Sequence, residues 1–421
     1  MREMKDSGIA WIGAIPAAWG VHRIASHFQE IKEKNTANAY SNTLQFKMGK
    51  IIAKPQKWDE DETNETYSAY TVVHPNTIMI NGLNLEFDFV TQRVARVECN
   101  GIITSAYIAL SPRDDINAEY ICYLLKSYDA CRAFHSMGRG LRKILRYSEL
   151  KNKPIVVPPL AEQERIAAFL DAECAEIDAV LEKTRASIEE YKKLKQAVIT
   201  QAVTKGVCGD RPMKDSGIEW IGDIPAEWDV VRIKNLFDYR NERNFKPLEE
   251  VNLISLYTDK GVVQHCDLDE TTGNKASNAD GYKLVYENDI VVNIILCWMG
   301  AIGRSAYFGV TSPAYDVYSP KQKTNSKFYH YLFRTNGFSG DCYKVGRGIM
   351  AMRWRTYSDQ FRAIKVVSPP QSEQEEIVEY LDEKCEGIDD LIAKKQQYLT
   401  EIENYKKSLI YEYVTGKKEV V

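Results

Sequence analysis

The chain has 421 residues, of which 44% are hydrophobic and 27% are charged, a composition typical of a protein with more than one globular domain. It contains no apolar run of the ~18 residues that a membrane span needs, and its N-terminal residues lack the apolar core of a signal peptide. We therefore expect a cytoplasmic protein that does not contact a membrane.

The formal net charge of −4 gives no general excess of positive charge that would indicate a nucleic-acid partner. The charge is uneven, however. Residues 1–153 carry +3 and residues 207–364 carry zero, whereas residues 154–206 carry −2 and residues 365–421 carry −5. Contact with DNA would therefore depend on local basic patches in the two larger segments.

The nine cysteines include no CxxC pair. This spacing argues against a disulfide framework or a zinc site, so we expect reduced thiols and no bound metal.

The chain is an internal duplication. Residues 4–24 and 213–233 are identical at 16 of 21 positions, and each of these tryptophan segments contains the sequence SGIxWIGxIPxxW. A second match begins at Pro158 and Pro369, with PPLAEQERI against PPQSEQEEI. Each half therefore has the same order: a tryptophan segment, a variable stretch, a Pro-Pro step and a charged segment.

The two charged segments carry apolar residues at steps of mostly three and four, which is typical of a coiled-coil stripe. The stripe includes Ile177, Leu181, Ile188, Leu194, Ile388, Ile392, Leu399 and Leu409. Gly206 and Gly416 stand where glycines that end helices are expected. We expect about 34 helical residues in each segment, a rod of roughly 50 Å. Packed antiparallel, the two rods would place the modules at opposite ends; alternatively, each helix folds onto its own domain.

The variable stretches combine short β-rich runs with a following helical stretch. In the first half the runs lie within residues 71–110 and the helix starts near Asn117; in the second they lie within residues 284–318 and the helix starts near Asn325. The order is shared but little of the sequence is. The pattern predicts one α/β (α+β) fold, with mixed or antiparallel β-structure, carrying a different surface in each half.

A Gly-Arg-Gly loop follows the helical stretch in each half, and each loop carries a charge of +4 over twelve residues. Arginine donates in a fork that matches phosphate oxygens or the edge of guanine, so these loops are candidate DNA contacts. The candidate residues are Arg139, Arg142, Lys143, Arg146, Lys344, Arg347, Arg353 and Arg355. A solvated basic hairpin, or a loop packed on the acidic helices, is the alternative.

Asn81 and Asn293 lie near the ends of predicted strands. Asparagine can bind adenine through two hydrogen bonds, although a role in a turn is the commoner explanation. Catalytic patterns are missing from the sequence: it contains no phosphate-binding loop for ATP, no dinucleotide fingerprint and no Asn/Asp-Pro-Pro-Tyr sequence of the amino-methyltransferase type.

Together, the tryptophan segments at Ser7 and Ser216, the PPLAEQERI and PPQSEQEEI helix starts and the helix ends AVTKG and YVTGK resemble the specificity (S) subunit of type I restriction-modification systems. The resemblance covers the whole chain. It implies target recognition domains at residues 1–155 and 207–365, separated by spacer helices at residues 156–206 and 366–421.

The resemblance also implies the function and the partners. Each recognition domain would bind one half of an interrupted double-stranded DNA site. The helices would dock two methyltransferase (M) subunits, and restriction (R) subunits would join the complex. S-adenosylmethionine, ATP and Mg would bind to those partners, so this chain would carry no cofactor and no catalytic residue. A self-contained DNA-modifying enzyme and a coiled-coil scaffold without DNA contact remain alternatives.

Overall fold

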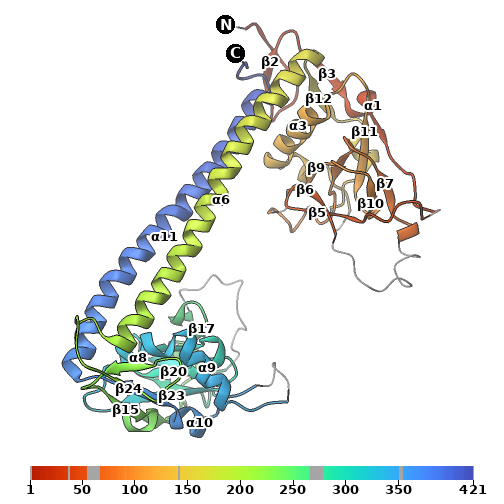
Figure 1. The fold of residues 1–421 in the computed structure, drawn as a ribbon. Helices are drawn as coiled ribbons and strands as arrows, with labels where there is room; N and C mark the ends of the chain where they lie inside the picture. The colour runs from red at the N-terminus through yellow and green to blue at the C-terminus, as the bar shows by residue number, and fades with distance from the viewer. Residues whose placement is uncertain are drawn as a thin grey trace. The chain divides into compact units, whose positions relative to one another are not determined.

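The computed structural model describes residues 2–36, 38–54, 67–90, 92–140, 143–265, 278–349 and 354–420. The chain forms two compact units. Unit 1 consists of Met1–Arg185 with Gln397–Val421, and unit 2 consists of Ala186–Gln396. Two long helices, α6 (Leu160–Lys205) and α11 (Gln371–Val414), contribute a segment to each unit (Figure 1).

The first variable stretch folds into short strands and helices. In chain order these are β1 (Met4–Asp6), β2 (Ala14–Pro16), β3 (Gly20–Arg23), α1 (Ile24–His27), β4 (Phe28–Glu30), β5 (Leu44–Lys47), β6 (Lys50–Ala53), β7 (Thr71–Val73), β8 (Ile78–Ile80), β9 (Val94–Arg96), β10 (Gly101–Ile103), β11 (Ile108–Pro112), α3 (Ala118–Ala130), α4 (Ala133–Met137), α5 (Tyr147–Leu150) and β12 (Pro154–Val157).

The second variable stretch repeats this order. Its elements are β13 (Met213–Asp215), β14 (Asp223–Pro225), β15 (Asp229–Arg232), α7 (Ile233–Leu236), β16 (Phe237–Arg240), η1 (Leu248–Glu250), β17 (Ile254–Tyr257), β18 (Gly261–Gln264), β19 (Lys283–Val285), β20 (Ile290–Asn293), η3 (Cys297–Met299), β21 (Ile302–Arg304), β22 (Gly309–Thr311), β23 (Tyr315–Pro320), α8 (Ser326–Phe333), α9 (Asn336–Val345), α10 (Ser358–Ala363) and β24 (Lys365–Ser368).

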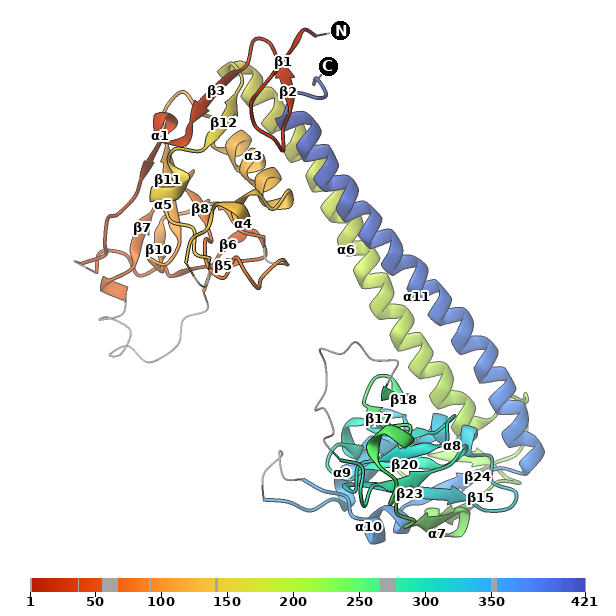
Figure 2. The same ribbon diagram turned by 180° about the vertical axis from the view of Figure 1, so that it is seen from behind.

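A four-stranded antiparallel sheet is the centre of each module. Its strand order is β4-β11-β8-β9 in unit 1 and β16-β23-β20-β21 in unit 2, so the two sheets have the same topology. Figure 2 labels the inner strands of both sheets, β8 and β11 in unit 1 and β20 and β23 in unit 2. The helix that follows is capped in both modules by an asparagine side chain, Asn117 or Asn325. The predicted α/β (α+β) class, with one fold used twice, is confirmed.

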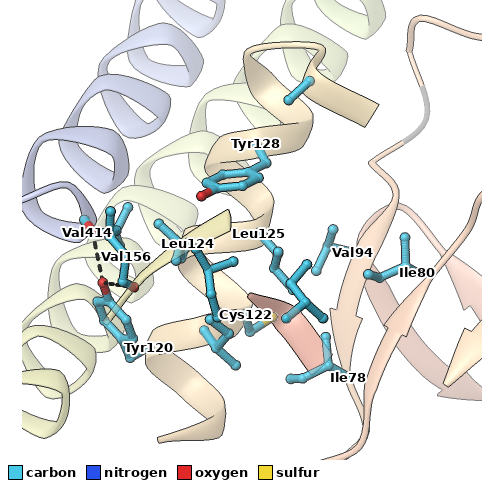
Figure 3. Packing of buried hydrophobic residues seen from close by; sticks show 14 of the residues in the cluster. Ile78, Ile80, Val94, Tyr120, Cys122, Leu124, Leu125, Tyr128, Val156 and Val414 are labelled. Atoms are coloured by element: carbon cyan, nitrogen blue, oxygen red, sulfur yellow. Dashed lines mark hydrogen bonds between the residues drawn. The ribbon is translucent and has the colours of Figure 1, made fainter. Parts of the chain in front are cut away.

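The core of unit 1 lies between the sheet, α3 and the ends of the long helices. Ile78, Ile80 and Val94 on the sheet face α3, as Figure 3 shows. On another side of α3, the Tyr120 hydroxyl donates its one proton between the carbonyl oxygens of Val414, at 3.0 Å, and Val156, at 3.4 Å. The last turn of α11 is therefore part of the first module's core, although 294 residues separate Tyr120 from Val414.

The tryptophan segments join each module to the start of a long helix. Trp19 is fully buried and its indole N–H donates to Glu162 Oε2 at 3.0 Å, while Arg2 pairs with the other oxygen of this carboxylate. In unit 2 the Trp228 indole donates to Glu373 Oε2 at 2.7 Å, and Arg211 pairs with Glu373 Oε1 at 2.5 Å. The close sequence repeat thus builds the same buried contact twice.

Each tryptophan segment also packs on the end of the other long helix. Lys205, at the end of α6, donates to the backbone carbonyl of Ile221 at 3.0 Å, and Lys417, just after α11, donates to the carbonyl of Ala14. Gly206 and Gly416 have φ values of +78° and +71°, which confirms their predicted role in ending the helices.

The long helices run antiparallel. In unit 1, Lys406 pairs with Asp178 at 2.6 Å and Arg185 with Glu403 at 2.7 Å; in unit 2, Lys195 pairs with Asp389 at 2.5 Å. The predicted antiparallel pair is confirmed, and the alternative that each helix folds only onto its own domain is wrong. The placement of the modules at opposite ends stays a prediction.

The helices are longer than expected. They have 46 and 44 residues, about 70 Å each, instead of about 34 residues, because each continues without a break from the Pro-Pro step almost to Gly206 or Gly416.

Most residues of the predicted stripe lie between the helices. Leu181, Ile188, Ile388 and Leu409 are buried and Ile177, Ile392 and Leu399 are half-buried. The prediction that Leu194 belongs to the stripe is wrong, because this side chain is 48% exposed. Seven residues after Ile188 the stripe position is Lys195, which pairs with Asp389, so Leu194 lies beside the stripe instead of in it.

Among the helices of the described residues, none has the length and hydrophobicity needed to cross a membrane.

We expect Trp19→Phe to lower the free energy of unfolding of unit 1 by about 1–3 kcal/mol, because the buried carboxylate of Glu162 loses a hydrogen bond. Trp228→Phe should have the same effect on unit 2. The measurement is urea denaturation followed by circular dichroism, with hydrogen exchange to assign the effect to one unit.

Trp11→Phe is the matched control. Within the described ranges the Trp11 indole N–H has no hydrogen-bond partner, so this change removes no bond. Equal losses for Trp11→Phe and Trp19→Phe would show that the bond to Glu162 is not what stabilises the unit.

Candidate nucleic-acid interface

The two Gly-Arg-Gly loops occupy the same place in both modules. Helix α4 ends at Gly138, and Arg139 then forms an antiparallel bridge with Ile144; helix α9 ends at Gly346, and Arg347 forms the same bridge with Arg355. The bridging N–H···O distances lie between 2.8 and 3.1 Å. Each loop therefore begins and ends at a bridged pair of residues. We call the described residues of these segments, 138–140 with 143–146 and 346–349 with 354–355, the basic tips.

The first glycine of each basic tip is required by packing. A Cβ atom on Gly138 would lie 2.7 Å from a Leu85 methyl group, and one on Gly346 would lie 2.3 Å from the Trp354 indole nitrogen. Trp354 itself stacks on Tyr343, with 4.9 Å between ring centroids. The absence of a side chain at Gly138 and Gly346 thus lets the tips pack against their modules. Gly140, with φ +84° and open space around it, has the freedom that approach to a ligand would use.

The basic side chains of the tips face solvent. Arg139, Lys143, Arg146, Lys344 and Arg347 are exposed and Arg355 is half-buried. Arg142 and Arg353 lie outside the described residues.

Lys344 differs from the other described basic residues of the tips because it forms an ion pair. It pairs with Glu219 at 3.0 Å, and this carboxylate raises the pKa of the Lys344 ammonium. In the part of the chain that the structure describes, Arg139, Lys143, Arg347 and Arg355 form no salt bridge with a carboxylate. Their charge is thus available to an anionic partner, whereas Lys344 would first have to leave Glu219.

Asn81 and Asn293 occupy equivalent positions where β8 and β20 end. Asn81 Oδ1 accepts from the backbone N–H of Leu83 at 3.1 Å. Asn293 is buried, and its Oδ1 accepts from the backbone N–H groups of Ile295 and Leu296 at 3.0 and 3.3 Å. These bonds fit the turn role that the sequence also allowed, and contact with adenine stays a prediction.

The loops that begin at Asn81 and Asn293 pack against the basic tips. Leu145 N–H donates to Gly82 O at 2.9 Å, and Thr356 N–H donates to Ile294 O at 2.9 Å. We call the described residues of these segments, 81–90 with 92 and 293–301, the companion loops. The sequence did not single out their exposed apolar side chains, because these segments contain several apolar residues and the sequence does not show that Leu85 is buried while Phe87 is exposed.

A second feature missed from sequence is a shallow groove on the helix segments of unit 1, lined by Glu173, Glu176, Ile177, Val180, Tyr398, Ile402 and Tyr405. Tyr405 and Val180 are 56% and 40% exposed. Their counterparts 211 residues away, Leu194 and Leu391 in unit 2, are 48% and 43% exposed. Apolar side chains beside the packed stripe thus recur in both units.

No described group of three or more His, Cys, Asp or Glu side chains could hold a metal ion, and the eight described cysteines are free.

Comparison with known proteins agrees with this architecture. The sequence matches the type I restriction modification DNA specificity domain over residues 99–190 and 225–403, more than half of the chain. It is 25% identical over 430 residues to the type I restriction enzyme MjaVIII specificity subunit of Methanocaldococcus jannaschii, covering 96% of this chain and 94% of that protein.

One solved structure shows the same fold. A chain from a study of complex assembly and conformational transition of the type I R-M system has a TM-score of 0.69 at 12% identity, with 96% of this chain and 99% of that chain covered. The HsdS subunit from Thermoanaerobacter tengcongensis has a TM-score of 0.48 at 15% identity, with 96% and 98% covered. The chain therefore belongs to the family of type I restriction-modification DNA specificity subunits, in which partner subunits of the enzyme carry out catalysis.

Proposed function

We propose that each module binds one half of an interrupted double-stranded DNA site through its basic tip and companion loop. The observation that carries this proposal is the recurrence of a solvent-facing basic tip at one place in two modules whose surrounding sequences differ. Shared position with different side chains is what two modules with different target sequences require.

We further propose that the long helices dock two methyltransferase subunits, one on each unit, and that restriction subunits join that complex. Support comes from the exposed apolar pair on each unit, Val180 with Tyr405 and Leu391 with Leu194. Exposed apolar residues favour binding to a protein partner. The acidic side chains beside them, such as Glu173 and Glu176, would repel the phosphates of DNA. S-adenosylmethionine, ATP and Mg would then bind to the partners.

The direct experiment is to sequence methylated adenines in DNA from cells that express this chain with its methyltransferase partner. A motif of two defined halves with an unspecified centre is expected. Methylation by the purified chain alone would favour the self-contained enzyme, and a complex that methylates without sequence preference would contradict DNA recognition by this chain.

The basic tips predict a salt effect. Arg139→Ala and Arg347→Ala should each weaken binding of the assembled complex to its site and reduce the slope of log K against log[salt] by about one, because each removes a phosphate contact. Binding is measured by fluorescence anisotropy at several salt concentrations.

The matched control is Arg23→Ala, an exposed arginine on β3 of the first module that lies outside the basic tip. It should leave the slope unchanged. If all three variants kept the wild-type slope and affinity, the basic tips would not be DNA contacts.

The helices predict the length of the unread centre. Inserting seven residues after Thr184 and seven after Glu403 keeps the stripe in register and lengthens both rods by about 10 Å. The unread centre should grow by about three base pairs at 3.4 Å each, and the two half-sites should stay the same. Methylation mapping measures this, and altered half-sites with an unchanged centre would contradict a spacer role.

The exposed apolar positions predict the stoichiometry. Tyr405→Glu and Leu194→Glu should each release one methyltransferase subunit, and the double variant should release both, because a buried carboxylate would replace an apolar contact. Native mass spectrometry reads the subunit count. Lys407→Glu, about 200° further around the helix than Tyr405, is the control and should keep both subunits.

A further inference from the structure

The companion loop of the first module holds large apolar side chains in solvent. Phe87 is 77% exposed and Val90 is 90% exposed, and both lie between β8 and β9. Burying such side chains against a partner gains free energy, and an exposed apolar cluster next to charged groups marks a binding surface.

The backbone of this loop is anchored by a buried arginine and a buried leucine. The buried side chain of Arg93 donates hydrogen bonds to three backbone carbonyl oxygens of the loop, those of Asn81, Leu83 and Asp88, at 2.6 to 3.1 Å. Leu85 is buried in the core, and its N–H donates to Lys143 O in the basic tip at 3.2 Å. Phe87 and Val90 are thus presented from an anchored backbone directly beside the basic tip.

The surroundings of the loop are cationic and aromatic. Phe89 stacks on His135, with 5.1 Å between ring centroids, and the Arg132 guanidinium lies 5.1 Å from the Phe89 ring. Arg139 and Lys143 of the adjoining tip are exposed. Apolar groups between cations match the major groove of duplex DNA, where thymine methyl groups lie between two rows of phosphates.

The second module has the same arrangement with different side chains. Met299 of its companion loop is 53% exposed and Ile349 of its basic tip is 93% exposed. Arg334 donates to the carbonyl oxygen of Gly300, in the companion loop, at 3.4 Å and to that of Ile302, the first residue of β21, at 3.0 Å. Apolar exposure beside a basic tip therefore recurs, while its chemical identity changes from one module to the other.

We propose that these apolar side chains are specificity-determining contacts with base edges. Phe87 and Val90 contact thymine methyl groups of the first half-site, and Met299 and Ile349 do so in the second, while the basic tips neutralise the phosphates. This inference rests on the proposed function and adds which residues distinguish bases. An apolar contact recognises the thymine methyl group in the major groove, which no cation can do.

The test compares Phe87→Ala combined with Val90→Ala, in the assembled complex with its methyltransferase partner, with the wild-type complex. Affinity for the methylated motif should fall about tenfold, while affinity for random DNA and the salt slope stay unchanged. Base-pair changes in the first half-site should then cost less affinity than they do for wild type, and changes in the second should cost the same. Val21→Ala, an exposed apolar residue on β3, is the matched control and should change neither affinity.

The methyl contact is tested chemically by replacing each thymine of the first half-site with deoxyuridine, one at a time. At one or more positions the wild-type complex should lose about fourfold in affinity, the value of one buried methyl group, and the double variant should lose nothing further there. In the second half-site, Met299→Ala should likewise remove the effect of deoxyuridine replacement, and in the first half-site it should leave that effect unchanged.

The outcomes separate the inference from the proposed function. If the wild-type complex prefers no interrupted site over random DNA, the proposed function fails. If it does discriminate, but the double variant discriminates equally well or no thymine responds to deoxyuridine, only the apolar contact is wrong. An equal loss for specific and random DNA would also overturn it, since a contact without sequence preference cannot determine specificity.

Discussion

One carboxylate at the start of each long helix connects the parts of its unit. Glu162 and Glu373 are nearly buried, and each accepts the indole N–H of a buried tryptophan while it pairs with an arginine. Removing one partner from such a buried pair is costly, because the remaining charge has lost its solvation. The contact joins the tryptophan segment to the helix start, and through that segment to the module.

The same tryptophan segments explain how a duplicated chain closes its cores. Lys205 and Lys417, from the ends of α6 and α11, donate to backbone carbonyls of the second and first segment respectively. Since Val414 also lies in the core of unit 1, the last residues of the chain complete the module formed by the first ones. Scaffold positions therefore changed little between the halves, whereas residues outside these contacts were free to diverge.

The candidate DNA surface combines two kinds of side chain that sequence reveals unequally. A run of four cations without an acid, as at residues 136–147, is visible in any sequence and occurs twice. Phe87 and Val90 carry no such signal, since other apolar residues stand beside them and the sequence does not show which of these are exposed. What makes them candidates for base contact is Arg93, which directly precedes β9. Its buried guanidinium donates to backbone carbonyls of the loop and so holds the loop beside the basic tip.

The sequence by itself determined the duplication, the helical character of the charged segments, the α/β modules and the place of the basic tips. These follow from local periodicity and repetition, which need no knowledge of distant contacts. The tertiary structure determined which residues pack between the helices and which distant groups form hydrogen bonds, neither of which periodicity predicts. It placed Lys195 in the stripe and Leu194 outside it, because ion pairing with Asp389 lets a lysine occupy an apolar position. In the tertiary structure the side-chain oxygens of Asn81 and Asn293 accept hydrogen bonds from backbone N–H groups of the following turns. It also brings the Tyr120 hydroxyl to the carbonyl oxygen of Val414. The sequence predicts neither contact, because each depends on where the folded chain places a particular backbone group.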